Sequence, residues 1–149
     1  MKNKLLLILL LFTITFSFAQ RKGDRDKIKS LKVAFITERL DLSAKEAQQF
    51  WPIYNDYDEK REALRRKERI EVRGKIKEAD ELSEKEARTL LEKYIRFEEE
   101  EEKLENAFLK NVGKVISAKK TLLLLRSEEE FKRRLIKQYR HNKGSGGYR

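Results

Sequence analysis

The stretch "LSAKEAQQFWPIYNDYDEK", residues 42–60, contains the signal that decides the fold. Ser43 is followed three residues later by Glu46, the spacing of a capping box in which each residue caps the backbone N–H of the other. The residues after it repeat an apolar side chain every three or four positions, as on one face of a helix. These are Ala47, Phe50, Trp51, Tyr54, Tyr57 and Leu64. The stretch therefore predicts an amphipathic helix that begins at Ser43.

A second stretch, "LSEKEARTLLEKYIRFEEE", starts at Leu82 with the same pattern that starts at Leu42. Ser83 and Glu86 form a second predicted capping box. Apolar residues then follow at helical spacing: Ala87, Leu90, Leu91, Tyr94, Phe97, Leu104 and Phe108. A weaker third echo, "ISAKK", begins at Ile116. The repeats predict that helices start at residues 43, 83 and 117.

The remaining boundaries complete an all-α fold of four helices. A short first helix spans about residues 28–40, and the second frays toward residues 79–80. The third ends near residues 110–113, and the fourth runs from Ser117 to about Tyr139, unless Ser127 restarts it. A tight turn at residues 80–82 makes the second and third helices a long antiparallel hairpin, in which residue i lies opposite about 162 − i.

This register places Arg61, Arg65 and Arg66 near the acidic run at residues 98–102. Each exposed ion pair contributes under about 1 kcal/mol, so the pairs mainly select the register. The alternative is that both charged runs are solvated helix faces without specific pairing.

The first residues have the layout of a cleavable signal peptide. Lys2 and Lys4 precede an apolar run over residues 5–16, and Ser17 and Ala19 occupy the small-residue positions before a cleavage site. The run is short for a bilayer span, although an uncleaved anchor is the alternative. We expect cleavage after Ala19, export to the periplasm, a flexible segment at 20–27, a single helical domain at 28–140 and a flexible tail at 141–149.

The composition limits the classes of function. The chain has 36 basic and 26 acidic residues and a formal charge of +10, which favours an anionic partner. An exported protein meets anionic lipids, surface polymers and unfolded polypeptides, so nucleic acid is not an expected partner. There is no cysteine, which excludes disulfides, thiol catalysis and a lipoprotein anchor.

Pro52 stands beside the only tryptophan, inside the predicted second helix. A proline there lacks the helical N–H and bends the axis, so Pro52 predicts a helix kink. Aromatic residues at helical spacing are usually core, which is one interpretation of this region. The other is a partly open concave face that binds a partner, with the candidates Phe50, Trp51, Tyr54, Tyr57, Arg61, Arg65, Arg66, Arg69 and Arg73.

The paired Leu-Ser-x-Lys-Glu starts, the Phe-Trp-Pro-Ile-Tyr run and the leader resemble the Spy/CpxP family of periplasmic proteins. The resemblance covers about residues 28–139 and is nearest to the Bacteroidetes members described as sensors of extracytoplasmic-function sigma factors. The hallmark of that family is a repeated Leu-Thr-x-x-Gln motif, for which Ser43 with Glu46 and Ser83 with Glu86 are capping equivalents. The resemblance implies a helical hairpin, which in the family often dimerises into a curved cradle. The sequence alone leaves dimerisation open.

No cofactor, metal or enzymatic reaction is predicted. The single histidine, His141, lies near the C-terminus, and the only methionine is Met1. A borderline or soft metal needs several His or Cys ligands at fixed spacing. The sequence also lacks a Gly-rich phosphate loop and a Ser-His-Asp set.

Three functions remain. The first is an ATP-independent holding chaperone that captures unfolded or envelope proteins. The second is an envelope-stress sensor or regulator that binds one membrane-bound signalling protein of sigma-factor control. The alternative to both is a basic helical protein that binds anionic lipid or surface polymer.

Overall fold

The computed structural model describes the backbone of residues 26–145 and the side chains of residues 26–141. All regular structure in this range is helical, without a strand, which confirms the all-α class. The described chain forms two compact units. Residues 42–122 are called the hairpin unit, and residues 26–41 with 123–145 are called the helix-pair unit. The predicted signal peptide and its cleavage site lie outside the described residues.

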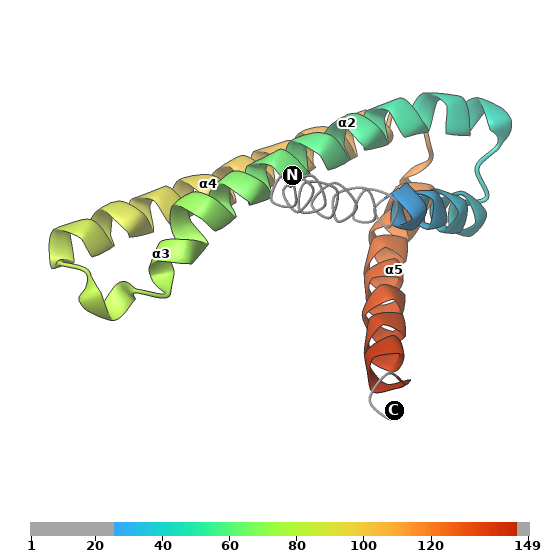
Figure 1. Ribbon diagram of the computed structural model, residues 1–149. Coiled ribbons are helices and arrows are strands. Elements are labelled where there is room, and N and C mark those ends of the chain that lie inside the picture. Colours follow the sequence, from blue (N-terminus) through green and yellow to red (C-terminus); the bar gives the residue numbers. More distant parts are fainter. Residues whose placement is uncertain (1–25, 146–149) are drawn as a thin grey trace, which may run out of the picture. The chain divides into compact units, whose positions relative to one another are not determined.

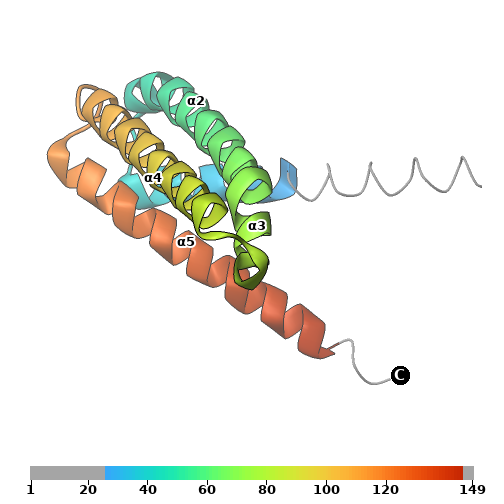
Figure 2. The same ribbon diagram turned by 90° about the vertical axis from the view of Figure 1, so that its left-hand side faces the viewer.

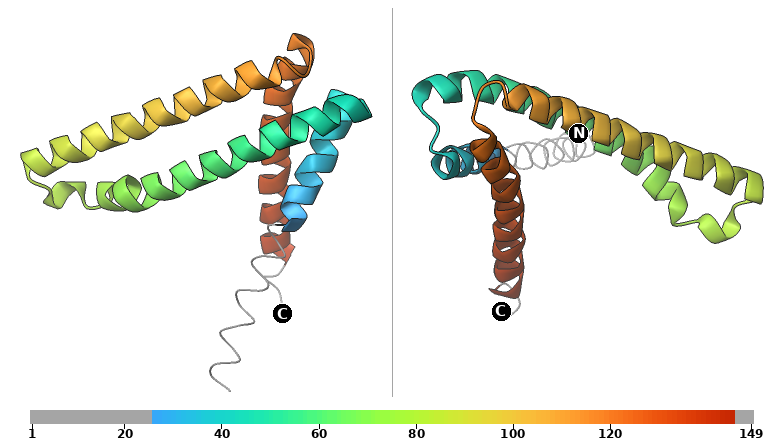
Figure 3. Two further views of the ribbon diagram at one scale, coloured as in Figure 1. Left: turned by 90° about the horizontal axis from the view of Figure 1, so that it is seen from above. Right: turned by 180° about the vertical axis from the view of Figure 1, so that it is seen from behind.

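Two long helices form the hairpin unit, α2 (Ala44–Glu68) and α4 (Glu84–Val112). They lie side by side in every view (Figures 1 and 3). The ring centroids of Tyr54 and Phe108 are 5.8 Å apart. Near the other end of the hairpin, the Lys93 amine lies 3.3 Å from a carboxylate oxygen of Glu71. Because one residue number rises as the other falls, the helices are antiparallel.

Pro52 lies inside α2 with an exposed ring, and residues on both sides of it remain in the same helix. Because Pro52 has no N–H, the backbone carbonyl of Gln48, four residues earlier, lacks its usual helical hydrogen-bond donor. The kink that the sequence predicts at Pro52 stays a prediction.

Both predicted capping boxes are present, which explains where the helices begin. The Ser43 hydroxyl accepts from the Glu46 N–H at 3.3 Å, and a Glu46 carboxylate oxygen accepts from the Ser43 N–H at 2.9 Å. Ser83 and Glu86 repeat this arrangement at 3.4 and 2.9 Å. Hydrogen bonds from the Ser83 hydroxyl and backbone lower the pKa of Glu86. The flanking residues Leu42 and Leu82 are both half-buried.

The third repeat begins α5 (Ala118–Ser145) and joins the first repeat through a side chain. The Ser117 hydroxyl accepts from the Lys120 N–H at 3.2 Å. Where the other repeats have glutamate, this one has Lys120, whose amine lies 2.8 and 3.0 Å from the carboxylate oxygens of Glu46. The hydrogen bond from Lys120, followed by those from Ser43, lowers the pKa of Glu46 to about 2.

This link predicts a loss of stability in acid. The pKa of Glu46 is lower in the folded chain, so its contribution is complete above pH 4.5 and is lost as the pH falls toward about 2. Replacing Lys120 with glutamine removes the main cause, and we expect the pKa of Glu46 to rise toward 4.5. Carboxyl NMR titration of Glu46 in both proteins measures this. A Glu46 that titrates near 4.5 in the unaltered chain would contradict the expectation.

The sequence predicts that the second helix frays toward residues 79–80, but the structure shows defined helical turns there instead. After Glu68 the helix passes through one π-helical turn (Arg69–Arg73), the short α3 (Gly74–Ile76) and a 3-10 turn (Ala79–Glu81). Figure 2 shows α3 where the chain turns back toward α4. A π-helical turn inserts an extra residue and rotates the side chains that follow it. Within this turn Val72 is buried, whereas Ile70 is 70% exposed.

The helix-pair unit contains the helix of residues 26–40 and the rest of α5. Phe35 meets Phe131 with 5.7 Å between ring centroids, and Arg39 forms an ion pair with Glu130 at 2.9 Å. Of the apolar residues in this helix, Ile36 and Leu40 are buried, whereas Ile28 and Leu31 are exposed. The helix α5 continues to Ser145, within the segment for which the sequence predicts a flexible tail.

Candidate protein-binding site

Three aromatic residues of the predicted binding face are core residues. Phe50, Tyr54 and Tyr57 are buried. Tyr57 stacks on Phe108 of α4, with ring centroids 4.0 Å apart and planes at 7°. Trp51 is half-buried and packs edge-on against Phe50 and Tyr54. The core interpretation therefore describes these three residues, and a partner cannot reach them in the folded hairpin.

Three arginines of the same face are held by carboxylates inside the hairpin unit. Arg61 and Arg65 donate to one oxygen of Glu101 at 3.0 and 2.6 Å, at the position that the register assigns to them. Partial burial raises the pKa of Glu101, but the hydrogen bonds from Arg65 and Arg61 outweigh it and leave the pKa lowered. Across the π-helical turn, Arg73 donates to the buried Glu68 at 2.7 Å, which raises the pKa of Arg73.

The remaining two arginines of the face, Arg66 and Arg69, are exposed. They do not form a large positive field, because residues 42–122 contain 19 basic and 19 acidic residues. The net charge of the chain thus resides outside the hairpin unit. The aromatic and basic residues of the predicted face do not form one open surface in this unit.

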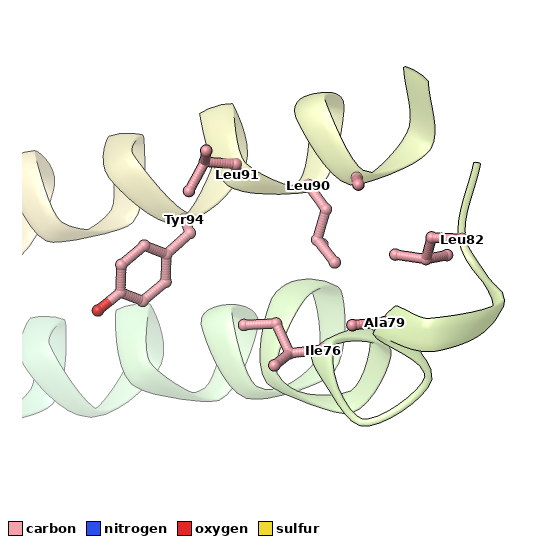
Figure 4. A pocket seen from close by; sticks show the side chains of 7 residues that line it. Ile76, Ala79, Leu82, Leu90, Leu91 and Tyr94 are labelled. Carbon is pink, nitrogen blue, oxygen red and sulfur yellow. The ribbon is translucent and has the colours of Figure 1, made fainter. Parts of the chain in front are cut away.

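An apolar pocket lies at the turning end of the hairpin, and it was not predicted from the sequence (Figure 4). It has a volume of about 330 Å³. Four lining residues lie on one face of α4, and three lie on or beside the short helical turns opposite. They are Ala87, Leu90, Leu91 and Tyr94 from α4, with Ile76, Ala79 and Leu82 from the turns.

Local sequence explains the pocket. Positions 87, 90, 91 and 94 follow helical spacing, so they share one side of α4. The cap at Ser83 fixes where that helix begins, and Leu82 in extended backbone precedes it. On the opposite side the helical chain ends at Ile76, and short turns face the remaining apolar residues.

Several lining side chains remain in contact with solvent. Leu91 is 58% exposed and Ile76 is 47% exposed, and Ile95 beyond the pocket is 47% exposed. Leu90 beneath them is buried. Contiguous apolar surface of this kind, surrounded by polar residues, is typical of sites that bind another molecule.

Charges of both signs surround the pocket. The negative charge of Glu98 and a hydrogen bond to it raise the pKa of the Tyr94 phenol. A second hollow of about 540 Å³ shares Leu82 and Leu90 with the pocket and is otherwise lined mainly by polar residues. These are Glu71, Lys75, Ser83, Lys85, Glu86, Thr89 and Lys93. The arrangement suits an extended polypeptide, which has apolar side chains and polar groups along its length.

No group of three or more His, Cys, Asp or Glu side chains in the described part of the chain is arranged to hold a metal ion. Within residues 26–145, no helix combines the length and apolar character that crossing a bilayer requires. Comparisons with known protein families, curated proteins and solved structures gave no match.

Proposed function

We propose that this protein is an exported, Spy/CpxP-like interaction protein of the cell envelope that binds non-native polypeptide through the pocket at the end of its hairpin. It holds such chains without ATP. The observation that carries the proposal is the exposed apolar pocket of Ile76, Leu91 and their neighbours, surrounded by charges of both signs. The envelope setting comes from the family resemblance in the sequence, and the helical hairpin is the kind of fold that this resemblance implies.

The same pocket also supports the sensor role that the resemblance implies. In that role a membrane-bound signalling protein of sigma-factor control occupies the pocket, and non-native chains displace it. Holding many clients and binding one regulator are distinguished by breadth: a chaperone accepts unrelated sequences, whereas a dedicated regulator binds one partner at fixed stoichiometry.

Aggregation assays test the holding function. The chain from Gln20 to Arg149 contains every described residue, and we expect it to suppress aggregation of several unrelated denatured proteins without ATP. Because the hairpin unit has no net charge, suppression should change by less than about threefold between low and high salt. Light scattering measures it, with an equal mass of a folded helical protein as control. Failure with every client would leave the dedicated regulator as the function.

A further inference from the structure

The positive charge of the chain is concentrated at its C-terminal end. Residues 131–149 contain seven basic residues and no acidic residue. The last acidic residue is Glu130, which already pairs with Arg39 and Arg126 at 2.9 Å each. The hydrogen bond from Arg126 and the charges of Arg39 and Arg126 hold the pKa of Glu130 below its ordinary value. Beyond this residue no carboxylate of the segment offsets the cations.

Helical geometry places most of these cations on one side of α5. Residues at positions i, i+1, i+4, i+5 and i+8 share an arc of a helix. Lys132, Arg133, Ile136, Lys137 and Arg140 have this spacing, and all five are exposed. We call these five residues the basic face. None of its four basic side chains forms an ion pair within the described part of the chain.

The other side of the same helix is occupied by packing. Phe131 is buried and Leu135 is half-buried. Arg134 lies over the ring of Phe35 at 4.7 Å from its centroid, so this cation takes part in the helix-pair unit itself. Helical spacing therefore places the basic face on the side of α5 opposite Phe131.

We propose that the basic face of α5 docks on an anionic phospholipid surface. Each Lys or Arg near such a surface contributes favourably, and amphipathic helices insert apolar side chains between the headgroups. Ile136 lies among the cations and is 45% exposed, and Tyr139 beside it is 63% exposed. A soluble polyanion would bind only the charged side chains, whereas a lipid surface would also bury the side chain of Ile136. The apolar residue within the basic face favours lipid, and the proposal does not depend on the hairpin pocket.

Vesicle binding tests the proposal. The chain from Gln20 to Arg149 is mixed with vesicles of phosphatidylglycerol and phosphatidylcholine, or of phosphatidylcholine alone, and bound protein is measured by sedimentation. We expect binding to anionic vesicles only, weakened by salt. The triple variant Arg133→Gln, Lys137→Gln, Arg140→Gln should lose about 100-fold in partition coefficient, at about fivefold for each cation.

A matched variant distinguishes an effect of the basic face from an effect of the total charge of the chain. Arg66, Lys67 and Arg69 are also exposed, and their replacement by glutamine removes the same charge from the hairpin unit. That variant should bind vesicles nearly as the unaltered chain does. Equal losses in both triple variants would overturn the proposal, because the effect would then be net charge alone.

The variant Ile136→Ser decides between lipid and a soluble polyanion. It should weaken vesicle binding about fivefold or more while heparin binding stays unchanged, since only a lipid surface accepts the apolar side chain. Unchanged vesicle binding would overturn the lipid assignment. Circular dichroism of each variant verifies that the helices are intact.

Discussion

Phe108→Ala is expected to lower the free energy of unfolding of the hairpin unit by about 3–5 kcal/mol, the usual cost of removing a buried aromatic ring. Phe108 is the residue of α4 on which Tyr57 stacks and against which Tyr54 packs edge-on. Its loss leaves a cavity between the two long helices. Because a domain is typically stable by only 5–15 kcal/mol, this loss removes a large fraction of the total.

Urea denaturation measures the effect, and the sequence provides its own probe. Trp51 is the only tryptophan and contacts the same aromatic cluster, so its fluorescence reports the unfolding of this unit. Leu122→Ala is the control, because Leu122 is 68% exposed and should cost less than about 0.5 kcal/mol. A Phe108→Ala loss below about 1 kcal/mol would show that the aromatic residues do not hold the hairpin together.

The double variant Ile76→Ser, Leu91→Ser is expected to weaken client binding about 10- to 100-fold. Both side chains line the pocket and remain about half exposed, so their replacement removes apolar contact with the client and little of the core. Because each side chain is already about half buried, its further burial against a client contributes about 0.7–1.4 kcal/mol. Affinity for a fluorescently labelled denatured client, measured by anisotropy, tests this.

The control for this variant matches it in chemistry. Ile70 and Leu122 belong to the same hairpin unit, are 70% and 68% exposed, and lie outside the pocket. The double variant Ile70→Ser, Leu122→Ser should bind clients within about twofold of the unaltered chain. If it loses as much affinity as the pocket variant, the binding depends on general surface hydrophobicity and the pocket has no special role.

Much of the architecture was predictable because it depends on local chemistry. The boxes at Ser43 and Ser83 depend on residues three positions apart, and the periodicity of α2 and α4 gave the correct class. The π-helical turn at Arg69–Arg73 was not predictable, because residues 69–73 carry no local pattern that distinguishes it from an α-helical turn. Helical backbone continues through that turn to Ile76, and Ile76 with the short turns after it lines one side of the pocket.

The candidate face was predicted less well, for a related reason. An aromatic stripe and a row of arginines look alike in sequence whether they are open or internally paired. Only the position of α4 shows that Tyr57 stacks on Phe108 and that Arg65 meets Glu101. Charge counted along the whole chain also hid its uneven distribution between residues 42–122 and the C-terminal segment.

Site-specific photocrosslinking tests most directly where the protein holds a non-native chain. A benzophenone amino acid is placed at position 91, within the pocket, or at position 70, an exposed apolar position outside it. Each protein is irradiated with the same denatured client. We expect strong client crosslinks from position 91 and few from position 70. Equal crosslinking from both positions, or crosslinks from position 70 alone, would contradict binding at the pocket.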